Sequence, residues 1–366
     1  MRQKLVLSSM PLLILILAFA PAAVASSKWY VNGANGSDSN NCQTLQAACL
    51  TIAGAISRTT SGDSIVIAAG TYGENLSVNS NLSLTGAGAR ATIIDGGSHN
   101  ADGGGGRVLV ISNTAHVAVS NLTIQNGIAN SGGGVLNSGT LTINNCSVLG
   151  NSAGNESVAG GGGILNYGTL TINNSTLSGN TVSARNAYGG AIYNSGSLTI
   201  NTSTLNGNSA TGILGTWGGG VGNYGKASIN SSTFSGNSST TGGNIYNGGT
   251  AATIQNSILA NSTTAGNCSG TMTSKGYNLS SDKTCQFTGP GDRNSTSPKL
   301  GVLQNNGGPT QTMAILSGSP AIDRGNPAGC TDGLGHLLKK DQRGAPRPDK
   351  EDSSGCDIGA FERQQD

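Results

Sequence analysis

The chain has 366 residues, of which 59 are glycine and only 10 % are charged, and its net charge is +2. Collagen would need glycine at every third position, and a disordered tail would have fewer than the 35 % hydrophobic residues found here, so an ordered fold rich in tight turns remains. No basic run marks a nucleic-acid-binding surface, and we expect no nucleic-acid partner.

The first 25 residues predict a cleaved export signal. Arg2 and Lys4 precede an apolar run at 12–20, and small residues at 23–25 form a cleavage site. The apolar run is shorter than the roughly 20 residues that a membrane-spanning helix needs. We therefore expect a secreted protein, extracellular or periplasmic, cleaved near Ala25 and without a membrane span in the mature chain.

A repeat predicts a parallel β-helix over residues 63–281. A glycine-rich motif and an alternating motif, each ending in asparagine, recur in five units at intervals of 29, 28, 29 and 24 residues. Apolar residues such as Leu141 and Ile143 alternate within each unit, which is the period of a strand. We expect each unit to form one turn of a solenoid whose short strands stack in parallel, about 4.8 Å apart.

Two columns of asparagine follow from this register. Aligned amides can hydrogen-bond along the axis and satisfy backbone groups at the bends, while the neighbouring glycines supply tight corners. We assign a structural role to the asparagines that end the glycine-rich motif, Asn137, Asn166, Asn194, Asn223 and Asn247, and to those that end the alternating motif, Asn151, Asn180, Asn208, Asn237 and Asn261.

Non-repeating segments flank the predicted coil. Within residues 26–62, an amphipathic pattern from Leu50 to Ile56 predicts a short helix that covers the first turn. After residue 282 charges and prolines accumulate and the repeat stops, which predicts a second cap or appended domain over 282–366. The predicted fold class is all-β, a parallel β-helix with an N-terminal helical cap and a C-terminal cap domain.

Seven cysteines in an exported chain favour disulfides. The spacing suggests three local pairs, although spacing alone leaves other connectivities open: Cys42 with Cys49, Cys268 with Cys285, and Cys330 with Cys356. Cys146 is left over, and it falls in a column otherwise filled by serine, so we interpret it as a small stacked residue.

Several motifs resemble known families. The Gly-Gly-Ala191-Ile192 and Phe234-Ser-Gly-Asn237 stretches resemble repeats of chlamydial polymorphic outer-membrane proteins. The coil resembles right-handed parallel β-helices of the pectate-lyase type, and this resemblance implies the handedness. Downstream motifs resemble the bacterial choice-of-anchor Q domain proteins over roughly residues 28–363, among them Gly318-Ser-Pro-Ala-Ile-Asp323 and Cys356-Asp-Ile-Gly-Ala-Phe-Glu362.

The choice-of-anchor Q resemblance implies a surface or secreted β-helix and no particular set of catalytic residues. Proteins of this family carry one of several sorting signals, whereas this sequence ends directly after the last matching motif, at Asp366. We therefore expect release into the medium or periplasm rather than attachment to the cell.

Carboxylates are confined to the two ends of the chain. No Asp or Glu lies between Glu156 and Asp282, so the central turns lack the acids and bases that polysaccharide-cleaving enzymes use. Near the first turns a charged set could converge on one face, or could be ordinary charges on a solvated loop. Its candidate catalytic residues are Asp95, His99, Asp102 and Arg107, with Glu74, Arg90 and His116 beside them.

A second charged set lies in the C-terminal segment: Asp323, Asp332, His336, Asp341, Arg343, Asp349 and Asp357. We interpret it as hydrogen bonds and ion pairs that close the solenoid. Carboxylates of this kind could hold a metal ion such as Ca²⁺, but no spacing matches a calcium loop. We predict no metal site and no cofactor.

Aromatic residues gather near the glycine-rich turns of successive units: Tyr167, Tyr188, Tyr193, Trp217, Tyr224 and Tyr246. They form either a strip for sugar stacking or lateral packing at the bend. A hydroxyl column could bind ice or a crystalline glycan, although threonine is also a good strand residue: Thr142, Thr171, Thr199, Ser228 and Thr253.

Together these patterns favour an exported, non-enzymatic scaffold or adhesin-like protein that binds a glycan or a cell-surface component. The alternative is a carbohydrate-active enzyme, a polysaccharide lyase or hydrolase, that uses the carboxylates near the first turns.

Overall fold

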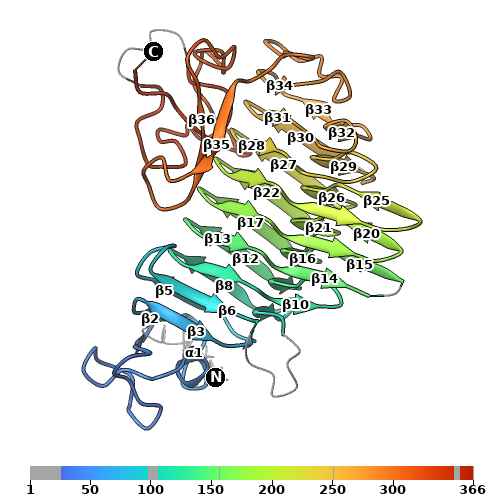
Figure 1. The fold of residues 1–366 in the computed structure, drawn as a ribbon. Helices are drawn as coiled ribbons and strands as arrows, with labels where there is room; N and C mark the ends of the chain where they lie inside the picture. Colours follow the sequence, from blue (N-terminus) through green and yellow to red (C-terminus); the bar gives the residue numbers. More distant parts are fainter. Residues whose placement is uncertain (1–25, 98–105, 156, 250, 350–354, 366) are drawn as a thin grey trace, which may run out of the picture.

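The chain winds into a right-handed parallel β-helix, shown in Figure 1 as a stack of short parallel arrows. The computed structural model describes residues 26–97, 106–155, 157–249, 251–349 and 355–365. The predicted export signal at residues 1–25 therefore lies outside the described residues, as do His99 and Asp102.

Three parallel sheets run the length of the coil. Sheet A consists of β1 (Lys28–Val31), β2 (Asp63–Ile67), β5 (Leu82–Gly86), β8 (His116–Ser120), β12 (Thr140–Asn144), β17 (Thr169–Asn173), β22 (Ser197–Asn201), β27 (Lys226–Asn230), β30 (Ala251–Gln255) and β33 (Thr273–Ser274). Sheet B consists of β3 (Gly70–Gly73), β6 (Thr92–Asp95), β9 (Thr123–Gln125), β13 (Ser147–Leu149), β18 (Thr176–Ser178), β23 (Thr204–Asn206), β28 (Thr233–Ser235), β31 (Ile258–Ala260) and β34 (Leu279–Ser280). Sheet C consists of β4 (Leu76–Val78), β7 (Leu109–Ile111), β11 (Val135–Asn137), β16 (Ile164–Asn166), β21 (Ile192–Asn194), β26 (Val221–Asn223), β29 (Ile245–Asn247) and β32 (Cys268–Ser269).

Two shorter sheets project from the central turns, and we call them the fin. Sheet D consists of β10 (Ile128–Ala129), β14 (Ser152–Gly154), β19 (Thr181–Ser183) and β24 (Ser209–Thr211), and sheet E of β15 (Val158–Gly160), β20 (Asn186–Tyr188) and β25 (Gly215–Trp217). A small core of alanines and Val182 separates these two sheets. The following unit has only 24 residues, and it continues the fin by single bridges at Ser238 and Thr241.

The apolar residues that alternate along the strands point into the core, as predicted. On sheet A, Leu141 and Ile143 are fully buried and pair in register with Leu170 and Ile172 of the next turn. The inward residues of sheets A, B and C form one continuous core along the axis. Each turn therefore buries its apolar residues against the turns above and below it, as expected of a solenoid.

The first column of asparagines forms a buried ladder at the end of the sheet C strands. Each side-chain amide donates to the next carbonyl oxygen, at 2.7, 2.7, 2.6 and 2.7 Å from Asn137 through Asn247. Asn137 begins the ladder. Its side-chain oxygen, Oδ1, has no hydrogen-bond partner in the described structure, because the residue that pairs with Asn137 on the preceding turn is Ile111.

The second column forms a ladder from Asn151 through Asn237, with amide distances of 2.9 Å. Asn261 was predicted to continue it, and this is wrong. Asn237 donates instead to Asn244 at 2.8 Å, and Asn244 donates to Asn267 at 2.9 Å. Asn261 is exposed, because in the shortened unit two asparagines from other positions fill the buried corner.

The N-terminal segment covers the first turn with the predicted helix, α1 (Ile52–Ile56). Thr51 caps this helix by accepting a hydrogen bond from the Gly54 N–H at 2.9 Å, and Ile52 is buried in the core. The same segment also contributes β1 to sheet A, so the first strand of the coil precedes the helix that covers it.

All three predicted disulfides are present: Cys42–Cys49, Cys268–Cys285 and Cys330–Cys356. Cys146 is the free cysteine of the described chain, and it is buried. Such a set of disulfides is typical of proteins that fold in an oxidising compartment.

The C-terminal segment, predicted over 282–366 as a second cap or an appended domain, has two parts. Its first part closes the coil, because Cys285 and Phe287 join the main core. Residues 296–349 and 355–365, which we call the strap, turn back and pack along the outer face of sheet B, beside the coil in Figure 1. The strap contains one antiparallel hairpin, β35 (Leu300–Gln304) and β36 (Thr312–Ile315).

Buried polar and apolar contacts hold the strap in place. The Gln342 amide donates to the Ser175 carbonyl at 3.2 Å and the Thr176 hydroxyl at 2.9 Å, and it accepts from the Thr204 hydroxyl at 2.6 Å. Farther along, outward apolar residues of β31 and β34 and residues of the strap share a second core: Ile258, Ala260, Leu279, Ile315, Ala321, Ile358 and Phe361.

Candidate glycan-binding surface

Five aromatic residues form a continuous strip where the fin meets the coil. Tyr188 ends β20 and Trp217 ends β25 in sheet E, whereas Tyr193 and Tyr246 lie in β21 and β29 of sheet C. Tyr224 directly follows β26. We call these five residues the aromatic strip.

Local sequence explains why these rings face outward. Ala187 and Ile192 are fully buried, and strand alternation turns the adjacent Tyr188 and Tyr193 to the outer surface. Glycine at positive φ joins the two sheets in each turn, with φ of 63° at Gly189 and 67° at Gly218. The sharp bend therefore brings rings from two different sheets together.

Every ring of the strip contacts at least one other ring. Tyr188 stacks on Trp217 with ring centroids 4.7 Å apart and planes 12° apart, which matches the spacing of neighbouring strands. Tyr193 lies 5.6 Å from Tyr188, and Tyr246 lies 6.4 Å from Trp217. The lateral packing expected from the sequence is thus present, and it also builds a surface.

A glycine makes room for the central ring. In sheet C, Tyr193 and Tyr246 occupy one register column and Gly222 lies between them. The Tyr224 ring centroid is 5.6 Å from the ring centroids of both Tyr193 and Tyr246. It therefore fills the space between them, where Gly222 has no side chain. The strip therefore continues across three turns without a gap.

The strip is partly open to solvent and carries no charge. Tyr224 is 36 % exposed, and the other four rings are half-buried. Burial, followed by the neighbouring tyrosines, raises the pKa of Tyr224 far above its usual value, and burial raises the pKa of Tyr193. Both phenols therefore stay protonated at physiological pH and offer O–H groups that donate and accept hydrogen bonds.

Apolar rings beside neutral hydroxyls suit the chemistry of sugars. A sugar ring presents C–H groups on its faces and hydroxyls at its edge, and aromatic side chains with a polar tip can match both. Tyr167 lies one turn away and is 56 % exposed, but it makes no ring contact with the strip in the described structure.

The candidate catalytic residues near the first turns are engaged separately. The Asp95 carboxylate accepts from Gln125 and Asn126, each at 2.7 Å, and from the Gly97 N–H. Arg107 donates to the carbonyls of Ser131 and Gly132 at 2.7 and 2.8 Å. The structure thus gives both described candidates roles in holding the backbone and its turns.

The neighbouring charged residues also have local partners. Glu74 accepts from the first N–H groups of α1, at 2.8 Å from Ile52 and Ala53. Arg90 reaches across to the strap and donates to the Gly308 carbonyl at 2.9 Å. No common catalytic constellation forms from these described residues.

The C-terminal charged set forms a buried network inside the strap. Arg347 and Glu362 make an ion pair at 2.6 Å in which both side chains are fully buried. Arg343 pairs with Asp341 at 2.8 Å and lies over the Phe361 ring. Burial, together with the Glu362 carboxylate, raises the pKa of Asp357 to about 7. These pairs fit the predicted structural role, and neither Arg347 nor Glu362 was singled out from the sequence.

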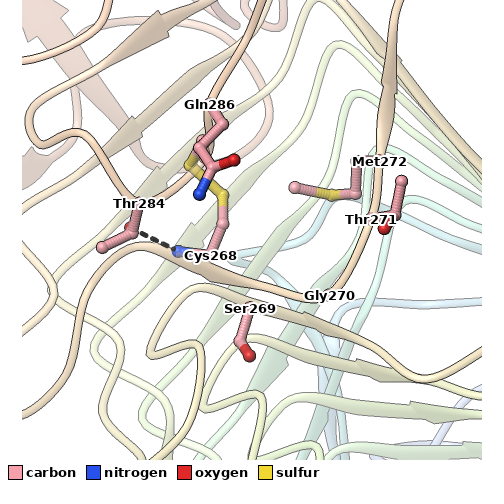
Figure 2. A pocket seen from close by; sticks show the side chains of 8 residues that line it. Cys268, Ser269, Gly270, Thr271, Met272, Thr284 and Gln286 are labelled. Atoms are coloured by element: carbon pink, nitrogen blue, oxygen red, sulfur yellow. Dashed lines mark hydrogen bonds between the residues drawn. A yellow bond between two sulfur atoms is a disulfide. The ribbon is translucent and has the colours of Figure 1, made fainter.

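A cavity of about 470 Å³ lies on the last turns, with the Cys268–Cys285 disulfide in its wall. Figure 2 shows the side chains that line it. The Thr284 hydroxyl accepts from the Cys268 N–H at 3.1 Å, and the Met272 and Gln286 side chains line the cavity beside the disulfide. Its described lining residues carry no charge.

The described residues contain no group of three or more His, Cys, Asp or Glu side chains placed to hold a metal ion. Within the same described ranges, no helix has the length and hydrophobicity to cross a membrane.

The fold and this surface define a parallel β-helix protein with a partly exposed aromatic strip. Solved structures of similar fold include pectate lyase Pel9A, at 16 % identity over 93 % of this chain and 97 % of that chain, with a TM-score of 0.45. Pectin methylesterase PemA from Erwinia chrysanthemi matches at 16 % identity over 73 % and 82 %, with a TM-score of 0.35. No protein-family model and no curated protein sequence matches, so the choice-of-anchor Q resemblance stays a prediction.

Proposed function

We propose that this protein is an exported glycan-binding β-helix and that the aromatic strip holds a polysaccharide chain. The observation that carries the proposal is the unbroken contact of five half-open rings across three turns, with neutral phenol groups among them. The three disulfides support a location outside the cytoplasm.

The composition of the central turns favours a neutral polysaccharide. No carboxylate occurs between residues 157 and 281, and the basic residues there are Arg185, Lys226 and Lys275. A surface with so few charges gains little from a charged ligand, so ring stacking and hydroxyl hydrogen bonds would supply the affinity.

Tryptophan fluorescence tests this proposal. The chain has two tryptophans, and Trp29→Phe leaves Trp217 as the single reporter within the strip. Titration with soluble neutral polysaccharides such as glucans, mannans and xylans should give a saturable change for at least one of them. Tyr224→Ala and Tyr246→Ala should each weaken that binding about 3- to 10-fold, because one ring contact is worth about 0.5–1.5 kcal/mol.

Ile213→Ala is the matched control, because Ile213 lies on the same turn and is 88 % exposed but is outside the strip. It should leave the affinity unchanged. The proposal fails if none of the glycans gives a saturable response, or if the tyrosine variants bind as tightly as the control.

A polysaccharide lyase or hydrolase is the second candidate function. A groove of about 300 Å³ between sheet B and the strap is lined by Arg90, Gln125 and Gln311, and Gln125 also holds Asp95. Release of unsaturated products or new reducing ends, abolished by Asp95→Asn and retained in Tyr224→Ala, would replace the binding proposal by this one.

A further inference from the structure

A second candidate site lies at the junction of the last turn and the strap, far along the chain from the aromatic strip. A cavity of about 330 Å³ is lined there by Tyr277, Arg293, Asp323, Arg324 and Pro327, with Gly291 and Gly325 between them. These residues come from the closing segment of the coil and from the strap, so the cavity exists only when the two are docked.

Backbone hydrogen bonds fix both walls. Arg293 donates to the Asn278 carbonyl at 2.7 Å and accepts from the Ser280 N–H at 2.7 Å, which holds it beside β34. The Tyr277 N–H donates to the Pro290 carbonyl at 2.7 Å. On the strap side, the Asn326 N–H donates to the Asn256 side chain at 2.9 Å, and this contact anchors the segment that carries Asp323 and Arg324.

The charged groups around this cavity lack protein partners. Asp323 donates its N–H to Asp357 at 2.9 Å, but its own carboxylate Oδ1 is buried and accepts no hydrogen bond. Arg293 and Arg324 make no side-chain hydrogen bond and no ion pair within the described structure. A buried acceptor without a donor is unfavourable, and proteins rarely keep one without a reason.

The side chains around the cavity indicate the chemical groups that a ligand would need. Two guanidinium groups suit a carboxylate, which they can bind with paired hydrogen bonds. The Asp323 carboxylate repels an anion but accepts hydrogen bonds from hydroxyls, and the Tyr277 ring offers an apolar surface. The ligand therefore needs a carboxylate, hydroxyls and a compact ring or chain, all within one small molecule or polymer unit.

We propose that this cavity binds a sugar acid, a uronic acid unit, with its carboxylate at Arg293 and Arg324 and a hydroxyl at Asp323. A simple anion such as phosphate would pair with the arginines but would give Asp323 no hydroxyl donor. A neutral sugar would give Asp323 a hydroxyl donor but would leave the arginines without an anion. The proposal is independent of the aromatic strip and holds whether or not the strip binds a glycan.

Isothermal titration of the exported chain with glucuronate tests the site, with glucose as the neutral match. Glucuronate should bind at least tenfold more tightly than glucose. Arg324→Gln should weaken glucuronate binding about tenfold or more, whereas Arg185→Gln, an exposed arginine on the fin, should leave it unchanged. Asp323→Asn keeps an acceptor for the hydroxyl and removes the charge that repels the ligand carboxylate, so it should bind glucuronate at least as tightly as the wild type. Asparagine also accepts the positive φ of 52° at this position.

Two further arms separate the possible outcomes. A titration with polygalacturonate shows whether the site takes a uronate within a polymer or a free sugar acid. If the ligand is a polymer, polygalacturonate should bind more tightly than the monosaccharide. If the ligand is a free sugar acid, the monosaccharide should bind at least as tightly as polygalacturonate. Trp217→Ala should bind glucuronate normally even if it loses all binding at the strip. Absence of glucuronate binding, or equal binding by Arg324→Gln and Arg185→Gln, overturns the proposal.

Discussion

Cys146 illustrates how a column of the repeat decides the chemistry of one residue. Its Sγ lies 3.2 Å from the Asn144 carbonyl, and the equivalent Ser175 hydroxyl donates to Asn173 at 2.7 Å. Complete burial raises the pKa of the Cys146 thiol to about 12. The residue therefore takes the place of a buried serine rather than that of a nucleophile.

We expect Cys146 to be unreactive in the folded protein, because almost none of the thiol is ionised near neutral pH and the thiolate is the reactive form. Titration with Ellman's reagent at pH 8 should detect no free thiol until denaturant is added, and then one. Cys146→Ser should change the free energy of unfolding by less than about 1 kcal/mol, because serine already fills this column. Rapid labelling of the native protein would contradict this.

For the charged residues near the first turns, the sequence left two interpretations open. Asp95 and Arg107 could belong to a catalytic cluster, or they could be ordinary charges on a solvated loop. The structure shows their hydrogen bonds to amides and carbonyls of neighbouring turns. Composition shows which residues are available for chemistry, but not whether the fold uses them to satisfy its own backbone.

At the scale of the element, the asparagine ladders join neighbouring turns. Asn180 donates to the Val148 carbonyl and to Asn208, each at 2.9 Å, and its carbonyl oxygen accepts from the backbone and side chain of Asn151. The repeat made these ladders predictable, because a constant interval places equal residues at equal heights. The same reasoning wrongly placed Asn261 in the ladder. The interval shortens in that unit, and Asn244 and Asn267 occupy the buried corner instead.

Asn180→Ala should lower the free energy of unfolding by about 2–4 kcal/mol, because it leaves buried backbone groups of Asn151 and Val148 without partners. Asn35→Ala is the matched control. Asn35 is exposed and does not have a positive φ, so its substitution should change stability by less than about 0.5 kcal/mol. Chemical denaturation of the two variants measures both values. Similar stabilities would show that the ladder contributes little.

The strap was the least predictable element. Its main polar contact joins Gln342 to Ser175, 167 residues apart, and no periodic pattern in the sequence marks either residue for the other. Gln342→Ala removes that contact and leaves the Thr204 hydroxyl without its acceptor. We expect limited proteolysis to cut within residues 296–349 at least tenfold faster in this variant while the coil stays intact. Gln365→Ala, at an exposed position, should be cut at the wild-type rate.

At the scale of the whole molecule, the buried carboxylates of the strap make stability depend on pH. The pKa of Asp357 is raised to about 7, and burial also raises the pKa of Glu362. In the unfolded chain an aspartate ionises near pH 3.9, so between about pH 4 and 7 the folded protein binds more protons than the unfolded chain. Stability from this source is therefore complete at low pH and is lost as the pH rises through 7.

The midpoint of thermal unfolding should accordingly fall between pH 4.5 and 7.5, and Asp357→Asn should remove most of that fall. Asp63 and Asp332 have lowered pKa values, and their contribution is lost only below about pH 4, so it does not interfere in this range. A midpoint that rises across the range, or a fall that Asp357→Asn does not alter, would contradict the assignment.

The path of the strap also affects how the molecule comes apart. In a plain solenoid each turn touches only its two neighbours, so turns can fray one at a time from either end. Here one segment bonds to Thr176 on β18, Thr204 on β23 and Thr233 on β28, three successive turns. Unfolding from the C-terminal end therefore requires the strap to detach from all three turns, so we expect the central turns to unfold together rather than one after another.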